Sequence, residues 1–306
     1  MAADEKNDVL NAVQSSSSAS LDIVRRRRQG VPAEPTLQGS IKPRLQLQKI
    51  QPAPDTTLLC RYELKYRIPE TKARAIAQYV SAFIHPDRYA KNKPGNEYLI
   101  SSLYLDTPTL TLCNETLQGK KNRFKLRIRG YDDNPLSPVF LEIKRRACNV
   151  IVKSRVGVKK AELGDILAGR YIPPLTYAKD RDAFNQFMMY AAALSARPIV
   201  LVRYMRQAFE GDSDNRVRIT FDRQLCFKTT CQPVVSVNGT GWTSVAMDFV
   251  VLEIKFTSRY PLWLSEMVKI FDLKQSSMSK YVSSVQQSCQ LGYCSPPAGS
   301  IWCYDE

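Results

Sequence analysis

The amino-acid sequence predicts an α+β protein built on an antiparallel β-sheet of about eight strands, with a charged inner face and several covering helices. Segments with the two-residue period of β-strands recur along most of the chain. Many of these segments are joined by short turn sequences, which favours hairpins and an antiparallel sheet. About eight strands is also the number that closes a sheet into a barrel wide enough for a small ligand.

The stretch from Lys121 to Val158 shows the strand period most clearly. It contains the runs R-F-K-L-R-I-R, V-F-L-E-I-K and V-I-V-K-S-R-V, in which charged and apolar residues alternate. The charged residues of each run therefore share one face of a strand, and the apolar residues share the other. The charged faces carry Arg123, Lys125, Arg127, Arg129, Glu142, Lys144, Lys153 and Arg155.

The remaining elements follow from the same kind of pattern. Further strands are expected at 60–68, 99–106, 199–209, 217–228 and 249–256. Helices are expected at 69–84, 160–169 and 180–196, from Pro261, and from near Ser279, with proline at the first helical position in two of them. The Met and Phe residues of 180–196 have helical spacing and are expected in the core.

Charge points to an anionic ligand. The net charge is +15, and residues 1–57, with eight basic and six acidic residues, hold only +2 of it, so +13 falls on the rest. The period leaves open whether the charged face is solvated on an open sheet or enclosed in a barrel. Crowded like charges repel by about 1 kcal/mol or more per pair at ~4–6 Å unless they are screened. A surface so rich in cations therefore favours an enclosed face that a polyanion fills.

Several classes of protein are disfavoured by composition. His85 is the single histidine, and the eight cysteines form no C-x-x-C pair, so histidine-based catalysis and a zinc site are not expected. No apolar run approaches the roughly 20 residues that span a bilayer, and no signal peptide is recognisable. We expect a cytoplasmic protein with a disordered tail at 1–57, one catalytic domain at 58–290 and a loose tail at 291–306.

The motifs, taken in order, resemble those of a known family. R-Y-E-L-K-Y, Y-L-I-S-S-L-Y-L-D-T-P, G-K-K-N-R-F-K-L-R-I-R-G-Y, F-L-E-I-K, R-I-T-F-D, V-L-E-I-K-F and S-K-Y are similar to the VTC domain. This is the polyphosphate polymerase domain of the vacuolar transporter chaperone, within the triphosphate tunnel metalloenzyme superfamily, and the resemblance covers about residues 58–285. It implies an eight-stranded antiparallel tunnel barrel that binds ATP and one or two divalent ions, Mn²⁺ or Mg²⁺.

The resemblance also implies the site residues. Phosphates are expected to be held by Lys65, Arg127, Arg129, Lys144, Arg155, Arg203, Arg218 and Lys280. Strand parity adds Lys153 and Lys255 as ligand-binding residues, with a charge at the rim of the tunnel as the alternative for Lys153. Glu253 is the expected metal ligand, with Glu63 and Glu142 as helpers. Asp222 is expected to orient an arginine rather than to bind metal, and Tyr66 and Tyr104 are expected in the core.

The function predicted is ATP-dependent transfer of phosphate to a growing polyphosphate chain, with ATP and polyphosphate or pyrophosphate as partners. A tunnel triphosphatase, in which water replaces the acceptor, and a non-catalytic polyphosphate-binding module remain alternatives. Specific nucleic-acid binding is not expected, because the cations alternate along strands and no reader motif is present. The sequence has no transmembrane segment, as in soluble bacterial members of the family, and it leaves open a membrane-protein partner and the oligomeric state.

Overall fold

The computed structural model describes residues 62–91, 93–147, 150–211, 217–257 and 260–295. The predicted tail at 1–57 lies outside the described residues, as does most of the predicted tail at 291–306. In the part of the chain that is described, no helix is long and apolar enough to cross a membrane.

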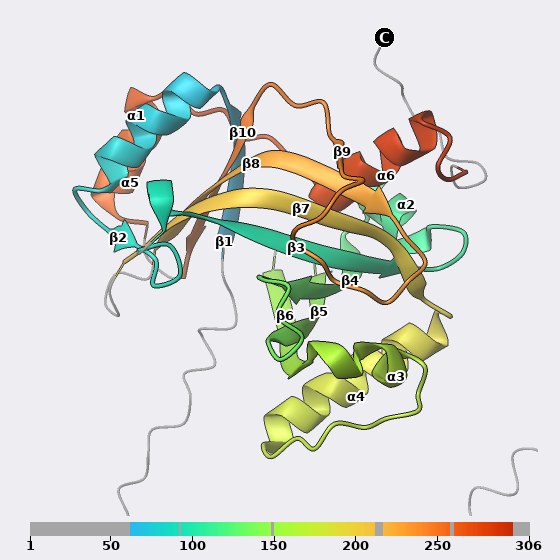
Figure 1. The fold of residues 1–306 in the computed structure, drawn as a ribbon. Helices are drawn as coiled ribbons and strands as arrows, with labels where there is room; N and C mark the ends of the chain where they lie inside the picture. Colours follow the sequence, from blue (N-terminus) through green and yellow to red (C-terminus); the bar gives the residue numbers. More distant parts are fainter. Residues whose placement is uncertain (1–61, 92, 148–149, 212–216, 258–259, 296–306) are drawn as a thin grey trace, which may run out of the picture. The chain divides into compact units, whose positions relative to one another are not determined.

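The order of elements largely follows the predicted one (Figure 1). The strands are β1 (Tyr62–Ile68), β2 (His85–Pro86), β3 (Glu97–Asp106), β4 (Asn122–Gly130), β5 (Pro138–Ala147), β6 (Val150–Lys159), β7 (Arg197–Glu210), β8 (Arg218–Thr229), β9 (Thr243–Ser244) and β10 (Val250–Phe256). The α-helices are α1 (Glu70–Val80), α2 (Thr111–Leu117), α3 (Leu163–Leu167), α4 (Ala178–Ala193), α5 (Leu262–Ile270) and α6 (Lys280–Gln290). Short 3₁₀ helices, η2 (Pro94–Asn96) and η3 (Lys160–Glu162), precede β3 and α3.

One antiparallel sheet contains all the strands. Its path is β1-β10-β8-β7-β3-β4-β5-β6, with β2 paired to β7 and β9 paired to β8 outside the path. The predicted eight-stranded antiparallel arrangement is thus confirmed. Closure into a barrel is not shown, because no ladder between β1 and β6 is present among the described residues. Side chains nevertheless bridge that end of the sheet, since Lys144 Nζ of β5 lies 2.8 Å from Glu63 Oε2 of β1.

The strand register places the predicted charged residues on one face. Lys65 is opposite Glu253 on β10, and Arg127 is opposite Glu142, which in turn is opposite Arg155 on β6. The alternate residues of these strands, such as Leu126 and Ile128, are fully buried in an apolar cluster. Parity in the sequence therefore predicted correctly which residues share the charged face of these strands.

Two groups of helices cover the outer, apolar face. Ile76 of α1 and Met267 of α5 pack with Phe221 and Leu252 of the strands at one end of the sheet. Phe187 of α4 packs with the outer residues of β4, β5 and β6 at the other end, and Figure 1 shows these two groups of helices well apart. Each group leaves the charged face free for a ligand.

Helix α6 differs, because it packs on the same face as the charges. Its Tyr281 stacks on Tyr104 with ring centroids 4.6 Å apart, and Tyr104 is directly opposite Arg127 across the β3–β4 ladder. The N-cap of α6 is Ser279, whose hydroxyl accepts a hydrogen bond from Val282 N. One helix thus fills part of the inner face with apolar side chains and presents its N-terminus to the charged part.

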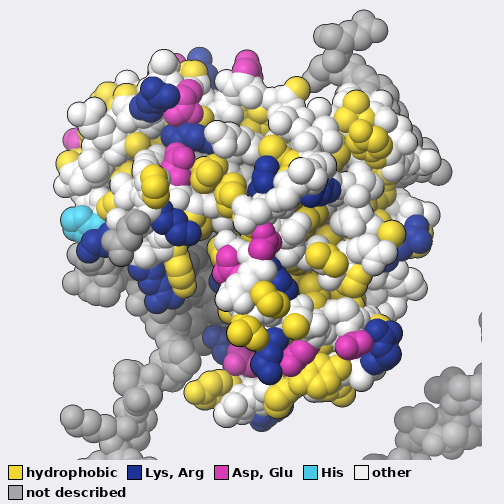
Figure 2. Space-filling model, in the orientation of Figure 1, with side chains coloured by type: hydrophobic (Ala, Val, Ile, Leu, Met, Phe, Trp, Pro, Cys, Tyr) yellow, Lys and Arg dark blue, Asp and Glu magenta, His cyan; other side chains and the backbone are white. Residues whose placement is uncertain are grey.

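Local details differ from the predictions where proline is involved. Pro69 and Pro261 are the N-caps of α1 and α5 rather than their first helical residues. The short strand β2 lies in a segment for which no element was predicted, and Gly169, with φ +70°, ends the helical segment predicted at 160–169. Figure 2 shows charges of both signs scattered among apolar residues on one surface, where the single histidine, His85, is exposed.

Candidate functional site

A cavity of about 470 Å³ lies on the inner face and is lined by side chains from all eight strands of the sheet path. Eleven basic side chains line it against two carboxylates, those of Glu63 and Glu253. The basic residues are Lys65, Lys125, Arg127, Arg129, Lys144, Lys153, Arg155, Arg206, Arg218, Lys255 and Lys280. We call this the cationic cavity. All the predicted phosphate-binding residues except Arg203 belong to it.

Glu142 is the centre of one cluster of cations. Its carboxylate is fully buried and receives Arg127 Nε at 2.7 Å and Lys153 Nζ at 2.6 Å. Arg155 Nε and Arg129 Nε lie 3.4 and 3.9 Å from it. Burial by itself raises the pKa of Glu142, but Arg129, Arg127 and Lys153 hold it well below its usual range. The carboxylate stays ionised and orients four cations toward the cavity.

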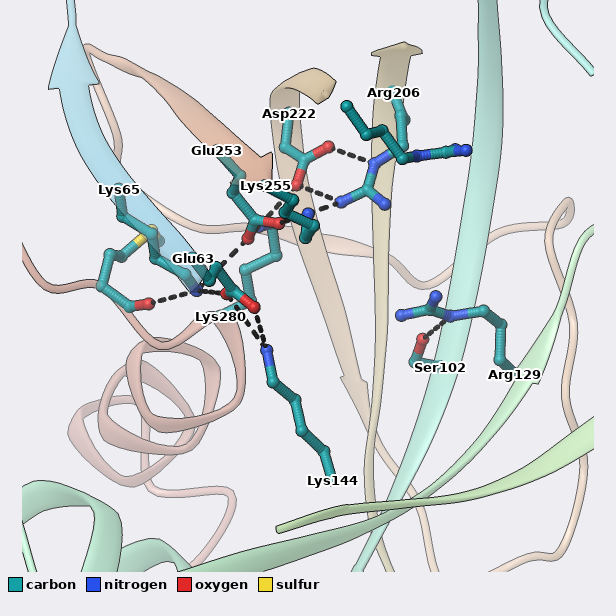
Figure 3. Close-up of polar contacts among 12 residues, drawn as sticks. Glu63, Lys65, Ser102, Arg129, Lys144, Arg206, Asp222, Glu253, Lys255 and Lys280 are labelled. Atoms are coloured by element: carbon teal, nitrogen blue, oxygen red, sulfur yellow. Dashed lines mark hydrogen bonds and ion pairs between the residues drawn. The ribbon is translucent and has the colours of Figure 1, made fainter. Parts of the chain in front are cut away.

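Glu253 and Asp222 hold a second cluster of cations (Figure 3). Arg206 makes a bidentate pair with Asp222, with both N–O distances 2.6 Å. Lys280 Nζ lies 2.6 Å from Asp222 and 3.3 Å from Glu253 Oε1, and Lys255 Nζ lies 2.6 Å from Glu253 Oε2. Asp222 therefore orients an arginine, as the sequence suggested, and it also holds the first residue of α6.

Glu63 links this second cluster to β5. Lys65 Nζ lies 3.3 Å from Glu63 and 3.2 Å from Glu253, so one ammonium group bridges two carboxylates. Lys144 extends from β5, seventh in the sheet path, toward Glu63 of β1, as Figure 3 shows. Burial opposes ionisation of Glu63, but Lys144 and Lys65 lower its pKa, so this carboxylate also stays charged.

A row of three lysines crosses β4, β5 and β6. Lys125 is directly opposite Lys144, and Lys144 is directly opposite Lys153. Side chains in such positions have Cβ atoms ~4.5–5.5 Å apart, where like charges destabilise a sheet. Burial, together with neighbouring cations, lowers the pKa of all three lysines, that of Lys153 to about 7. In the described contacts Lys125 has a hydroxyl partner, Ser279 Oγ at 2.7 Å, and no carboxylate.

Arg218 is held at another end of the cationic cavity. Its guanidinium lies 2.6 Å from Asp87 and 2.7 Å from Glu210, so both anionic partners fix its position. Asp87 is 2% exposed and also accepts hydrogen bonds from Tyr98 Oη at 2.9 Å and from two backbone amides. Arg218 lines the cavity as predicted, and Asp87 is a supporting residue that the sequence reasoning missed.

The prediction for Arg203 is wrong in its location. Arg203 donates to Val237 O at 2.8 Å and lies over the Trp242 ring, and it does not line the cationic cavity. Arg206, three residues later, has the opposite parity and takes the inner position. The motif R-Y-M-R contains both arginines, and only the register with β3, which sets Arg206 opposite Tyr98, identifies the inner one.

The two tyrosines predicted in the core have different surroundings. Tyr66 is buried in an apolar cluster with α1 and α5, which confirms its prediction. Tyr104 is buried too, in the apolar cluster that contains α6, and it also lines the cationic cavity, directly opposite Arg127. The core prediction is therefore confirmed for Tyr104 as well, and because β3 is buried on both faces its alternation does not show which face borders the cavity.

The residues of this site fit a divalent ion that shares its ligands with a substrate. Glu63 and Glu253 offer hard carboxylate oxygens within 3.3 Å of one Lys65 nitrogen. No group of three or more His, Cys, Asp or Glu side chains forms a complete metal cage in the described part of the chain. Mg²⁺ is usually bound by one or two carboxylates together with substrate phosphates, which suits this pair. Glu142, predicted as a helper, contacts cations on every oxygen.

These features define an antiparallel-sheet protein with a cavity lined by arginine and lysine, side chains whose chemistry suits phosphate groups. The family model of the VTC domain matches residues 60–289, and the chain belongs to that family. The resemblance drawn from the sequence motifs is thereby confirmed. The family is of the triphosphate tunnel type, acts on phosphate compounds and generally depends on divalent metal ions.

Solved structures with a similar arrangement are distant. A putative adenylate cyclase from Bacillus halodurans is 13% identical, covers 72% of this chain and 94% of its own, and has a TM-score of 0.43. A Hippeastrum putative adenylyl cyclase, described as having a dominant triphosphatase activity, is 14% identical over 74% of this chain and 96% of its own, with a TM-score of 0.44. A Pyrococcus horikoshii protein is 14% identical over 75% of this chain and 98% of its own, with a TM-score of 0.36. Similarity at this level does not define a substrate.

Proposed function

We propose that this protein is a divalent-metal-dependent phosphotransferase that transfers the γ-phosphate of ATP to a growing polyphosphate chain. The observation that carries the proposal is the row of Lys125, Lys144 and Lys153 inside a cavity already lined by arginines. Glu63 and Glu142 contact Lys144 and Lys153, but Lys125 has no carboxylate among the described contacts. Three like charges in directly opposed positions weaken a sheet where they are incompletely balanced. The arrangement therefore supports a polyanionic substrate as the usual occupant.

Phosphoryl transfer suits the chemistry of these side chains. The reaction needs little covalent chemistry from a protein, but it needs the acceptor in line with the transferred phosphorus and neutralised charge on the equatorial oxygens. Eleven cations around one cavity supply that neutralisation. An acceptor phosphate carries its own nucleophilic oxygen, so no protein nucleophile is required, and the exposed His85 has no place in the reaction.

The residues divide into two roles in this proposal. Arg127, Arg129 and Arg155, held by Glu142, bind phosphate oxygens as directional donors. Glu253, with Glu63, would hold the divalent ion. When bound, that ion would neutralise phosphate charge and act as a Lewis acid. Lys65 and Lys280, which contact Glu253 in the structure, would then be free to bind phosphate.

A second cavity favours a long phosphate chain as ligand, and therefore synthesis of a polymer over hydrolysis of a triphosphate. It has a volume of about 690 Å³ and shares Glu63, Lys65, Lys125, Lys144, Ile151 and Ser279 with the cationic cavity. It is lined further out by three arginines, Arg67, Arg123 and Arg146. A phosphate chain longer than a triphosphate therefore has a continuous basic path in which to lie.

Incubation of the protein with ATP, Mn²⁺ and a pyrophosphate primer tests the proposal. We expect ADP and long phosphate chains, measured by gel electrophoresis and phosphorus NMR, and no product when EDTA replaces Mn²⁺. ADP with orthophosphate alone would assign a tunnel triphosphatase instead. Tight binding of polyphosphate without any turnover would assign a binding module.

A further inference from the structure

Two tyrosines form an aromatic pair at one end of the cationic cavity. Tyr89 and Tyr131 both line it, and their rings are within 7° of parallel with centroids 6.3 Å apart. Tyr98 adds a third ring, 6.5 Å from Tyr89 and 6.4 Å from Tyr131. The faces of such rings are electron-rich and do not attract phosphate, so they suit a different part of a ligand.

The position of the exposed Tyr89 ring is fixed by buried groups. The ring is 55% exposed, yet its backbone amide donates to Asp87 Oδ1 at 3.1 Å. Asp87 N in turn donates to Ala208 O of β7 at 2.9 Å. The guanidinium of Arg88 lies 4.7 Å from the centroid of the Tyr89 ring. Because these bonds already order the loop, little conformational entropy of its backbone is lost when a ligand binds. The exposed Tyr89 ring is therefore preorganised for binding.

The opposite end of the cavity has a different chemistry. Lys125 of β4 lies beside Ser279, and both residues line the second, arginine-lined cavity as well. Arg127 and Arg129 follow at alternate positions on the same strand, and Tyr131 comes directly after it. The six residue steps from Lys125 to Tyr131 extend over about 20 Å. Along one strand the cavity thus changes from lysine through arginine to aromatic rings.

We propose that Tyr89 and Tyr131 bind the base of the nucleoside triphosphate by stacking, with its phosphates directed along β4 toward Lys125. This inference rests on the proposed function and adds an orientation to it. Stacking on aromatic side chains does not distinguish strongly between bases, because every base has a π-face. No Asn or Gln is among the described residues that line the cationic cavity, so the base edge meets few groups that would read it. The site therefore accepts ATP and GTP with similar affinity.

Equilibrium binding in EDTA, where turnover is absent, tests this assignment. Dissociation constants are measured for ATP, GTP and inorganic tripolyphosphate, which has no base. In Tyr89→Ala we expect the affinity for ATP and for GTP to fall at least about fivefold, the lower range for one base–aromatic stack. The affinity for tripolyphosphate stays within about twofold, because no phosphate ligand is removed. Tyr89→Phe, which keeps the ring, behaves as the unchanged protein.

The outcomes separate this inference from the proposed function. If Tyr89→Ala weakens ATP and tripolyphosphate equally, or weakens neither while tripolyphosphate still binds, the stacking assignment is wrong and the phosphate site stands. If the unchanged protein binds neither tripolyphosphate nor ATP, the proposed function itself is wrong. Because Tyr89 is exposed, its replacement leaves the fold intact, and an unchanged melting temperature checks this.

Discussion

Glu142 shows how a single residue sets the charge of the site. Its fully buried carboxylate is shared by Arg127, Arg129, Lys153 and Arg155. Replacement by Gln leaves these cations without their anion, and loss of one partner in a buried ion pair costs about 3–5 kcal/mol. We expect Glu142→Gln to lower the free energy of unfolding by about that amount in phosphate-free buffer, measured by urea denaturation.

Binding of a polyphosphate ligand should restore part of the stability that Glu142→Gln loses. Tripolyphosphate, bound by the same cations, replaces the missing charge, so the difference between Glu142→Gln and the unchanged protein should shrink in its presence. Asp165→Asn is the matched control, because Asp165 is exposed and pairs with one arginine, Arg170, which predicts a loss of about 1 kcal/mol or less. An equal loss with and without tripolyphosphate would show that Glu142 does not balance ligand-binding cations.

Glu253 is the residue on which the metal assignment depends. Glu253→Gln keeps the size of the side chain but removes the charge that a divalent ion requires. We expect turnover to fall by two orders of magnitude or more, the range seen when an electrostatic group at a reaction centre is lost. Tripolyphosphate affinity in EDTA should be unchanged or higher, since Lys65, Lys255 and Lys280 lose a competing anion. An unaltered Mn²⁺ dependence of the rate would remove Glu253 from the metal site.

Lys153 makes anion binding depend on pH. Burial and the nearby Arg127 and Arg129 lower the pKa of Lys153 to about 7. A lysine whose pKa is depressed in the folded state destabilises the protein most below that pKa, and stability recovers as pH rises from about 7 toward the ordinary value near 10.4. Bound phosphate favours the charged form, so affinity for tripolyphosphate should fall as pH rises from 6 to 9, with uptake of a proton on binding.

Titration calorimetry in buffers of different ionisation enthalpy measures that proton uptake at pH 8. Lys153→Arg should abolish most of it, because arginine stays protonated throughout this range. Lys159→Arg, on the same strand but exposed and paired with Glu162, is the control and should leave the uptake unchanged. Identical uptake in Lys153→Arg and the unchanged protein would assign the proton to another group.

At the scale of elements, α6 is attached to the sheet through Asp106. The carboxylate of Asp106 is fully buried and accepts hydrogen bonds from Tyr281 Oη at 2.6 Å and from Leu112 N and Cys113 N of α2. Tyr281 is adjacent to Lys280, which lies between Asp222 and Glu253. Asp106 is therefore a positioning residue that acts on the site through α6.

Tyr281→Phe tests this connection because it removes one hydrogen bond and keeps the ring that stacks on Tyr104. We expect a loss of about 1 kcal/mol in stability and a several-fold weaker tripolyphosphate affinity, since Lys280 and Ser279 lose their fixed position. Tyr66→Phe, in the outer apolar cluster, is the control for removal of a tyrosine hydroxyl. A stability loss in Tyr281→Phe without any change in affinity would make its role purely structural.

Strand parity in the sequence accounts for the parts of this site that were predicted, and its limits account for the errors. Charged and apolar residues alternate from Arg123 to Arg129 on β4 and over L-E-I-K on β5, so the inner positions of Arg127, Arg129 and Lys144 could be predicted without a structure. On β7, Arg203 and Arg206 lie three residues apart and so face opposite sides, and a register shift against β8 falls between Arg203 and Met205. Which of the two is inner depends on pairing with distant strands, which no local pattern contains. The supporting carboxylates Asp87 and Asp106 lie in or beside loops, where periodicity gives no signal.

At the scale of the whole molecule, the free protein carries an electrostatic cost that its ligand removes. Eleven cations line the cationic cavity, whereas six carboxylates of the described residues contact them, those of Glu63, Asp87, Glu142, Glu210, Asp222 and Glu253. A ligand that binds only the folded state at a hundred times its dissociation constant stabilises it by about 2.7 kcal/mol. For a domain of this size we expect tripolyphosphate to raise the melting temperature by about 5–11 °C, and sodium chloride of equal ionic strength to raise it much less.

A substitution at Lys125 distinguishes charge repulsion within the cavity from the general screening of charges by salt. It has no carboxylate partner among the described contacts, and burial with Lys65 and Lys144 nearby holds its pKa well below the ordinary value. Replacing it by Met, which is similar in length, removes one repelling charge and leaves an apolar side chain in a half-buried position. Lys125→Met should therefore raise the melting temperature of the free protein and reduce the further rise that tripolyphosphate produces. Lys179→Met, at an exposed position on α4, should change neither quantity. A lower melting temperature for ligand-free Lys125→Met would show that repulsion within the cavity is already balanced, and the argument that a polyanion normally occupies it would lose its physical basis.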